Sequence, residues 1–138
     1  MRVRRGAITL TVGLALISFG LKDGSAAEAD LPEKQAIVIE LQQAVRANDK
    51  AWLAANTRYP FSYFGHGKRI IRGKAAFIRN YALLSGAKLR AAILAQGPAN
   101  VFENWQGLMV GEGRYNIWVR DTADGEPARY RIVAINGS

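Results

Sequence analysis

The spacing of apolar residues predicts that helices come first in this chain. A stripe of apolar residues at helical intervals follows Pro32, a residue favoured in a first helical turn, so we expect a helix over residues 32–46. The stripe consists of Ile37, Leu41, Ala44 and Val45. Asn48 and Asp49 then supply a turn and a new N-terminal cap, which predicts a short second helix over residues 50–56.

The pattern next changes to extended segments joined by a reversal. Because the residue before a proline is pushed toward extended geometry, helical structure should end at Tyr59 and Pro60. Residues 61–64 then read as a strand, the glycines on both sides of His66 permit a turn, and residues 68–72 return. We therefore expect a β-hairpin.

The rest of the chain is predicted to form a helical region followed by a meander of strands. Helical spacing over residues 74–84 predicts a helix that Ser85 and Gly86 end. Residues 89–95 fit either a helix or a buried strand, and their alanines favour the helix. Strands are expected over residues 101–110, 115–120 and 129–135, with turns at 111–113 and 121–127. This order of elements predicts one α+β domain.

The first 29 residues have the layout of a cleavable secretory signal. Three arginines precede an apolar run from Gly6 to Leu21, and small residues follow. The run is shorter than the roughly 20 residues that cross a bilayer comfortably. Cleavage after Ala27 or Ala29 would leave one domain over about residues 30–138, with no transmembrane anchor. A lone arginine pair, Arg4 and Arg5, fits the general secretory route better than a twin-arginine route.

Composition limits the cellular location and the classes of partner that suit this chain. The chain has no cysteine, which excludes disulfides, thiolate metal sites and a lipid anchor on cysteine; export without disulfides suits a bacterial periplasm. The whole chain carries a net charge of +8. Removing residues 1–29 leaves 15 Lys and Arg and 9 Asp and Glu, a net charge of about +6. A basic exported domain favours anionic envelope ligands or an acidic protein partner. Export argues against nucleic acid as the partner.

Residues 71–81, Ile-Arg-Gly-Lys-Ala-Ala-Phe-Ile-Arg-Asn-Tyr, follow two helices and a strand. This stretch resembles the entry to the third helix in the NTF2-like superfamily, and residues 108–113 with Trp118 look like small exported bacterial proteins of that type. The resemblance implies an NTF2-like cone, in which N-terminal helices pack on a curved antiparallel sheet. It also implies a homodimer formed through the sheets. It brings no catalytic constellation that matches this sequence residue by residue.

A basic cluster interleaved with aromatic residues is the strongest candidate for a binding surface. Its residues are Lys68, Arg69, Arg72, Lys74 and Arg79. Basic residues interleaved with aromatic ones are typical of phosphate or single-stranded nucleic acid binding. Because we expect the protein to be exported, we expect its partner to be an anionic component of the envelope.

Candidates for lining a cavity are mostly aromatic. They are Trp52, Tyr81, Glu103, Trp105, Tyr115 and Trp118. Glu103 is the one acid that we expect near a cleft, whereas Glu112 and Asp121 lie in or beside turns. His66, between two glycines, reads as an exposed turn histidine. We assign no catalytic residue, no metal site and no cofactor.

Three functions remain open from the sequence. The first is a periplasmic, non-enzymatic binding or protein-interaction domain. The second is an NTF2-like enzyme or carrier of a small apolar ligand, in which Glu103 or His66 would move a proton. The third is a binder of anionic lipid or glycan through the basic cluster.

Overall fold

The computed structural model describes residues 32–123 and 129–137. The chain divides into two units, Met1–Leu31 and Pro32–Ser138, and the description below concerns the second. The predicted signal peptide therefore lies outside the described residues, as does most of the predicted turn at 121–127.

The described residues form a mixed α+β fold with five helices and six strands. The elements are α2 (Glu33–Ala47), α3 (Lys50–Ala55), β1 (Thr57–Gly65), β2 (Gly67–Ile71), α4 (Lys74–Arg79), α5 (Tyr81–Leu84), α6 (Ala87–Ala95), a 3-10 turn (Pro98–Asn100), β3 (Phe102–Asn104), β4 (Gly107–Glu112), β5 (Tyr115–Asp121) and β6 (Tyr130–Gly137). The predicted first two helices, the first hairpin and the helical choice for residues 89–95 are confirmed.

The junction between α2 and α3 follows directly from local sequence chemistry. Asn48 takes the left-handed conformation that ends α2, with φ 52° and ψ 43°, and asparagine tolerates this conformation better than most residues. The carboxylate of Asp49 then accepts a hydrogen bond of 3.0 Å from the backbone N–H of Trp52. This bond caps the first turn of α3.

The six strands form one sheet in the order β2-β1-β6-β5-β4-β3. Neighbouring strands are antiparallel except β1 and β6, which are parallel, so the expectation of a purely antiparallel sheet is wrong at this pair. The parallel pair arises because the meander that begins at β3 returns its last strand, β6, to the side of β1.

Two predicted segments are each divided in the structure. The helix expected over residues 74–84 breaks at Asn80, whose side-chain amide donates to the carbonyl oxygen of Ala76 (2.7 Å) at the end of α4. The strand expected over 101–110 is instead the hairpin β3–β4. Its turn is stabilised by Asn104, which accepts a hydrogen bond from the backbone of Gln106 (2.8 Å). β1 also begins earlier than expected, at Thr57, and contains a cis peptide bond between Tyr59 and Pro60.

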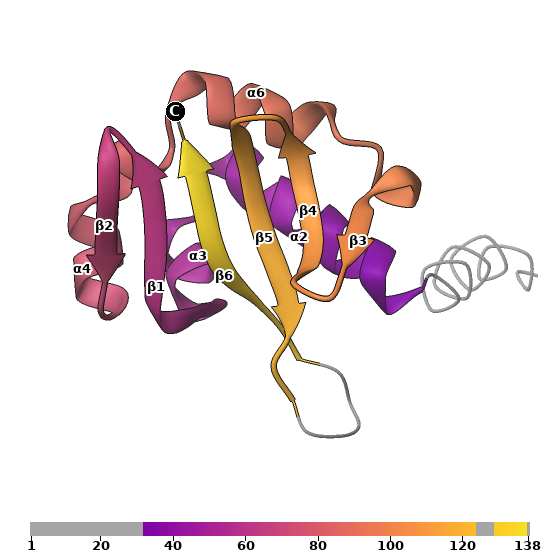
Figure 1. Cartoon of the computed structure of the whole chain (residues 1–138), viewed down its shortest axis with the longest axis horizontal. Helices are drawn as coiled ribbons and strands as arrows, with labels where there is room; N and C mark the ends of the chain where they lie inside the picture. The colour runs from indigo at the N-terminus through magenta and orange to yellow at the C-terminus, as the bar shows by residue number, and fades with distance from the viewer. Residues whose placement is uncertain (1–31, 124–128, 138) are drawn as a thin grey trace, which may run out of the picture. The chain divides into compact units, whose positions relative to one another are not determined.

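Helices cover one face of the sheet, and the other face carries no helix among the described residues (Figure 1). The core lies between the two layers. Its most deeply buried side chains are Val38, Leu41, Phe77, Ile93, Val110 and Ile132. We call the uncovered side the open face. It presents Phe64, which pairs with Lys68, and Ile70, which pairs with Ser62. It also presents Phe102 and Trp118.

Within residues 32–123 and 129–137, no helix is both long enough and apolar enough to cross a membrane.

Candidate functional site

The predicted basic residues lie at one end of the sheet, on the edge strand β2, on α4 and, for Arg72, in the short segment between them. We call Lys68, Arg69, Arg72, Lys74 and Arg79 the basic edge. All five side chains are exposed. The rings of Phe61 in β1 and Phe77 in α4 pack 5.9 Å apart between centroids, which holds α4 against this end of the sheet.

The basic edge is not a single flat patch. Lys68 and Arg69 are neighbours on a strand, so their side chains point to opposite faces of the sheet. Lys68 pairs with Phe64 on the open face, where its ammonium lies 5.9 Å from the centre of the Phe64 ring. Arg69 pairs with the buried Tyr63 on the helix side, the side from which Lys74 and Arg79 of α4 extend. The charges therefore wrap around the β2 end of the sheet.

A wider feature of the sequence surrounds this edge. From residue 50 to residue 102 the chain contains nine lysines and arginines and no aspartate or glutamate. This stretch folds into consecutive elements from α3 to α6. No acidic side chain from the stretch itself can therefore neutralise the basic edge. Besides the basic edge, the stretch contains four basic residues on other elements, namely Lys50, Arg58, Lys88 and Arg90.

The one ion pair found within the described ranges lies at the opposite end of the sheet. Lys34 of α2 and Glu103 of β3 approach to 2.6 Å, with about half of each side chain exposed. The bond to Glu103 raises the pKa of Lys34 above its ordinary value. β3 is the edge strand farthest from β2.

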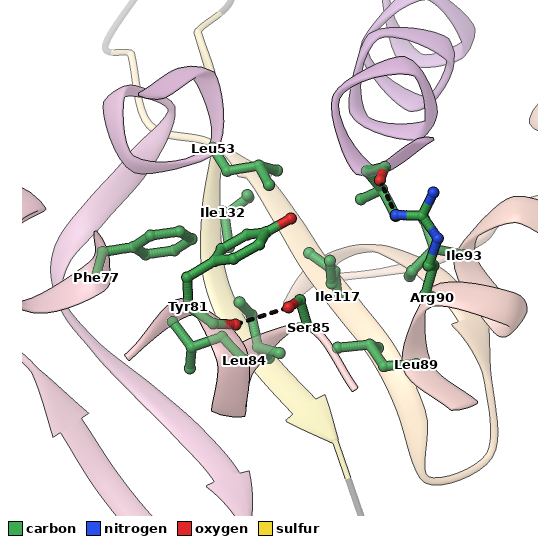
Figure 2. Close-up of a pocket in the computed structure, with 12 residues that line it drawn as sticks. Leu53, Phe77, Tyr81, Leu84, Ser85, Leu89, Arg90, Ile93, Ile117 and Ile132 are labelled. Atoms are coloured by element: carbon green, nitrogen blue, oxygen red, sulfur yellow. Dashed lines mark hydrogen bonds between the residues drawn. The ribbon is translucent and has the colours of Figure 1, made fainter. Parts of the chain in front are cut away.

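Between the helices and the sheet, the described residues enclose a small apolar cavity of about 30 Å³, whose lining is drawn in Figure 2. Its lining is mostly aliphatic and aromatic, including Leu53, Phe77, Tyr81, Leu89, Ile117 and Ile132. Ligand pockets usually begin at about 300 Å³, so this cavity has room for a water molecule or two at most. The interior is filled by the protein's own side chains.

The polar side chains beside this cavity are engaged in holding helices together. Figure 2 shows Arg90 reaching from α6 toward the end of α2. There its guanidinium donates to the carbonyl oxygens of Val45 and Arg46 and to the side chain of Asn48. The hydroxyl of Tyr81 donates to the same Asn48 side chain at 3.1 Å. Arg90 thereby satisfies two C-terminal carbonyls of α2, and Tyr81 holds the Asn48 side chain beside them.

Of the six residues predicted to line a cavity, Tyr81 lines the interior one. Trp52 and Tyr115 are partly buried and pack against the outside of the core. Trp118 lies on the open face, its ring 6.4 Å from that of Phe102, and Trp105 is 84% exposed in the β3–β4 turn. The sequence did not reveal that turn, so Trp105 was a candidate for lining the mouth or the interior of a cavity.

The candidate proton carriers lie on the surface. Glu103 is exposed and bound to Lys34, and His66 is exposed in the β1–β2 turn beside a surface hollow. Glu112 is exposed as well. The carboxylate of Asp121 accepts hydrogen bonds from the backbone N–H groups of Ala123 and Arg129, which lower its pKa below the usual range.

No three histidine or acidic side chains within the described ranges gather closely enough to hold a metal ion. The comparisons with known proteins give no relative: no family model, no curated protein and no solved structure matches the chain.

Proposed function

We propose that this protein is an exported, non-enzymatic binding domain that attaches to an anionic partner in the bacterial envelope through its basic edge. The observation that carries the proposal is the acid-free stretch over residues 50–102, whose nine basic residues include the five exposed residues of the basic edge, on and between β2 and α4. An exposed field of one sign attracts surfaces of the opposite sign and speeds association with them.

The fold that presents this edge is, in our proposal, the NTF2-like cone. Support comes from the element order, with two helices before a hairpin and a helical region before the meander, and from a sheet covered by helices on one face. Export rests on the arginines, apolar run and small residues of positions 1–29.

A binding role is also favoured over the enzyme or carrier alternative by the interior. A cavity of about 30 Å³ does not accommodate a substrate or an apolar cargo. The two residues that an enzyme would have used, Glu103 and His66, are exposed. The surface is therefore the better place for function.

Vesicle co-sedimentation tests the proposal with one defined partner surface. The protein should bind vesicles that contain phosphatidylglycerol and should not bind vesicles of phosphatidylcholine. Polyglutamate in solution is the second anionic probe and represents an acidic protein surface. Binding should weaken strongly between 0.1 M and 1 M salt, because the Debye length falls from about 10 Å to about 3 Å.

Matched charge variants locate the binding surface. Neutralising Lys68, Arg72 and Lys74 to glutamine should reduce binding at least about tenfold, a loss expected when several charges act together. The control variant, with Arg46, Arg114 and Arg129 changed to glutamine, loses the same charge elsewhere and should bind nearly normally. Equal losses in both variants, or no binding to either anionic probe, would contradict the proposal.

A further inference from the structure

A second group of basic side chains lies on the sheet away from the basic edge. Arg58 of β1, Arg131 of β6 and Arg120 of β5 come from three adjacent strands and line one polar hollow of about 450 Å³. Each precedes or follows a residue buried in the core, namely Thr57, Ile132 and Val119. Because side chains alternate along a strand, the three arginines are directed away from the core.

Two of these arginines face one another directly. Arg120 and Arg131 are partners in the register of β5 and β6. Like charges at directly opposed positions repel and destabilise a sheet. The pair therefore carries an unfavourable interaction that an anion between the two guanidinium groups would reverse.

The acid in the same hollow is engaged by its own loop. Asp121 accepts backbone hydrogen bonds of 2.9 Å from Ala123 and 3.1 Å from Arg129, and no ion pair joins it to Arg58, Arg120 or Arg131 in the described ranges. Among the described residues that line the hollow, three guanidinium groups and one carboxylate give an excess of two positive charges. An excess of two charges matches a phosphate dianion.

The availability of the three guanidinium groups differs. Arg131 donates to the carbonyl oxygen of Ala55 at 2.8 Å and so is held in place at the end of α3. No hydrogen bond or ion pair within the described ranges engages the guanidinium groups of Arg58 and Arg120, which leaves their planar donor forks free for a phosphate or carboxylate.

A second hollow continues from the first across the open face. It shares Arg120 and is lined by aromatic side chains, Phe64, Trp105 and Trp118, over about 430 Å³. An aromatic or apolar group attached to a phosphate bound among the arginines would lie against these rings. The two hollows thus offer one place for an anion and an adjoining place for its organic part.

We propose that this face binds an organic phosphate, with the phosphate held by Arg58, Arg120 and Arg131 and the organic group on Trp118 and its neighbours. The site is separate from the basic edge and does not depend on the function proposed for that edge.

The test is a titration followed by NMR amide shifts, with inorganic phosphate and phenyl phosphate as probes and chloride at equal ionic strength as reference. Both phosphates should shift the amides of Arg120, Asp121 and Arg131 in a saturable way, and phenyl phosphate should bind more tightly. Arg58→Gln and Arg120→Gln should each weaken both phosphates by about tenfold, while Arg114→Gln, an exposed arginine outside the hollow, should leave them unchanged. Trp118→Ala should weaken the binding of phenyl phosphate to the level of inorganic phosphate and should leave the binding of inorganic phosphate unchanged.

Three results would overturn the proposal. One is a phosphate response no larger than that of chloride, and another is a response that survives both arginine substitutions. The third concerns Asp124 and Glu126, acids of the adjoining sequence that lie outside the described residues. Phosphate binding that appears only after both are changed to their amides would identify these acids as the arginines' own counterions.

Discussion

At the scale of single residues, Gly111 is the backbone position least able to accept a side chain. It sits within β4 at φ +107°, and a Cβ added there would lie 2.3 Å from the carbonyl oxygen of Tyr115. We expect Gly111→Ala to lower the free energy of unfolding by about 3 kcal/mol, because strained geometry and a backbone clash add. Urea denaturation measures this change. Gly86→Ala is the control, since Gly86 has φ −56° and no atom near the new Cβ; its effect should stay within about 1 kcal/mol. Equal effects would contradict the explanation.

Gln42 is a buried polar residue whose amide joins two helices. Its side-chain nitrogen donates to the carbonyl oxygens of Ile93 (3.0 Å) and Gln96 (2.6 Å) at the end of α6. Gln42→Leu keeps the bulk but leaves these carbonyls without a donor, so we expect a loss of about 2 kcal/mol in thermal or urea unfolding. The adjacent Gln43 is exposed, and Gln43→Leu should change stability by no more than about 0.5 kcal/mol. A neutral Gln42→Leu would mean that water replaces the amide.

At the scale of elements, Arg90 fixes the end of α2 to α6. Its guanidinium reaches three acceptors at the α2 C-terminus, an arrangement that needs a planar group with several donors. We expect Arg90→Ala to cost about 2–3 kcal/mol in urea unfolding, and Arg90→Lys to recover only part of it, because an ammonium cannot span the three acceptors. Arg114→Ala, in the exposed β4–β5 turn, serves as the control. Full recovery by lysine would show that the positive charge alone is needed.

The loop after β5 should respond to acid through Asp121. Its pKa is lowered in the folded protein by backbone hydrogen bonds from Ala123 and Arg129. A lowered pKa stabilises the fold above the unfolded-state pKa, and this contribution is lost as pH falls through the folded value. Asp121→Ala should therefore melt at a lower temperature than the original protein at pH 7, and the two melting temperatures should converge at about pH 2. A constant difference across this range would exclude the carboxylate charge as the cause.

Some of these elements could be predicted from local sequence patterns, and others could not. Apolar spacing and turn residues located α2, α3, the β1–β2 hairpin and the last two strands within a few residues. The break at Asn80 was missed because an asparagine can continue a helix as well as end it, and here its side chain caps α4. The β3–β4 turn was missed because a tryptophan such as Trp105 is typical of a buried segment. In the structure Trp105 lies in the turn between Asn104, which accepts the hydrogen bond of the turn, and Gly107, which has a positive φ. The parallel β1–β6 pair depends on contacts between distant strands, which local patterns do not contain.

At the scale of the whole molecule, the predicted site divides into a part that sequence could locate and a part that it could not. Charge is visible in the sequence, so the five residues of the basic edge could be named as candidates, and the structure shows that they are exposed. The three arginines of the polar hollow, Arg58, Arg120 and Arg131, are 11 to 73 positions apart, and the sheet order alone brings them together. The interior could not be judged either, because a cavity of 30 Å³ is what remains after many side chains have packed. The expected homodimer stays a prediction.

The excess of positive charge should make the whole molecule respond to salt in a particular direction. The described ranges contain one ion pair, between Lys34 and Glu103, whereas every charged residue of the stretch over 50–102 is basic. Screening by salt then weakens more repulsion than attraction. We expect sodium chloride to raise the melting temperature by about 5 °C between low salt and 0.5 M, equivalent to about 1 kcal/mol for a domain of this size.

The charge variants separate this repulsion from a general salt effect. The variant with Lys68, Arg72 and Lys74 changed to glutamine should melt higher than the original protein at low salt and should respond less to added chloride, because the repulsion within the acid-free stretch has been reduced. The variant with Arg46, Arg114 and Arg129 changed to glutamine should keep more of the response, since its substitutions fall outside residues 50–102. If chloride lowered the melting temperature, favourable ion pairing would outweigh repulsion, and the basic edge would be neutralised within the molecule. Such a surface would have little excess charge to offer an anionic partner, so this measurement also bears on the proposed function.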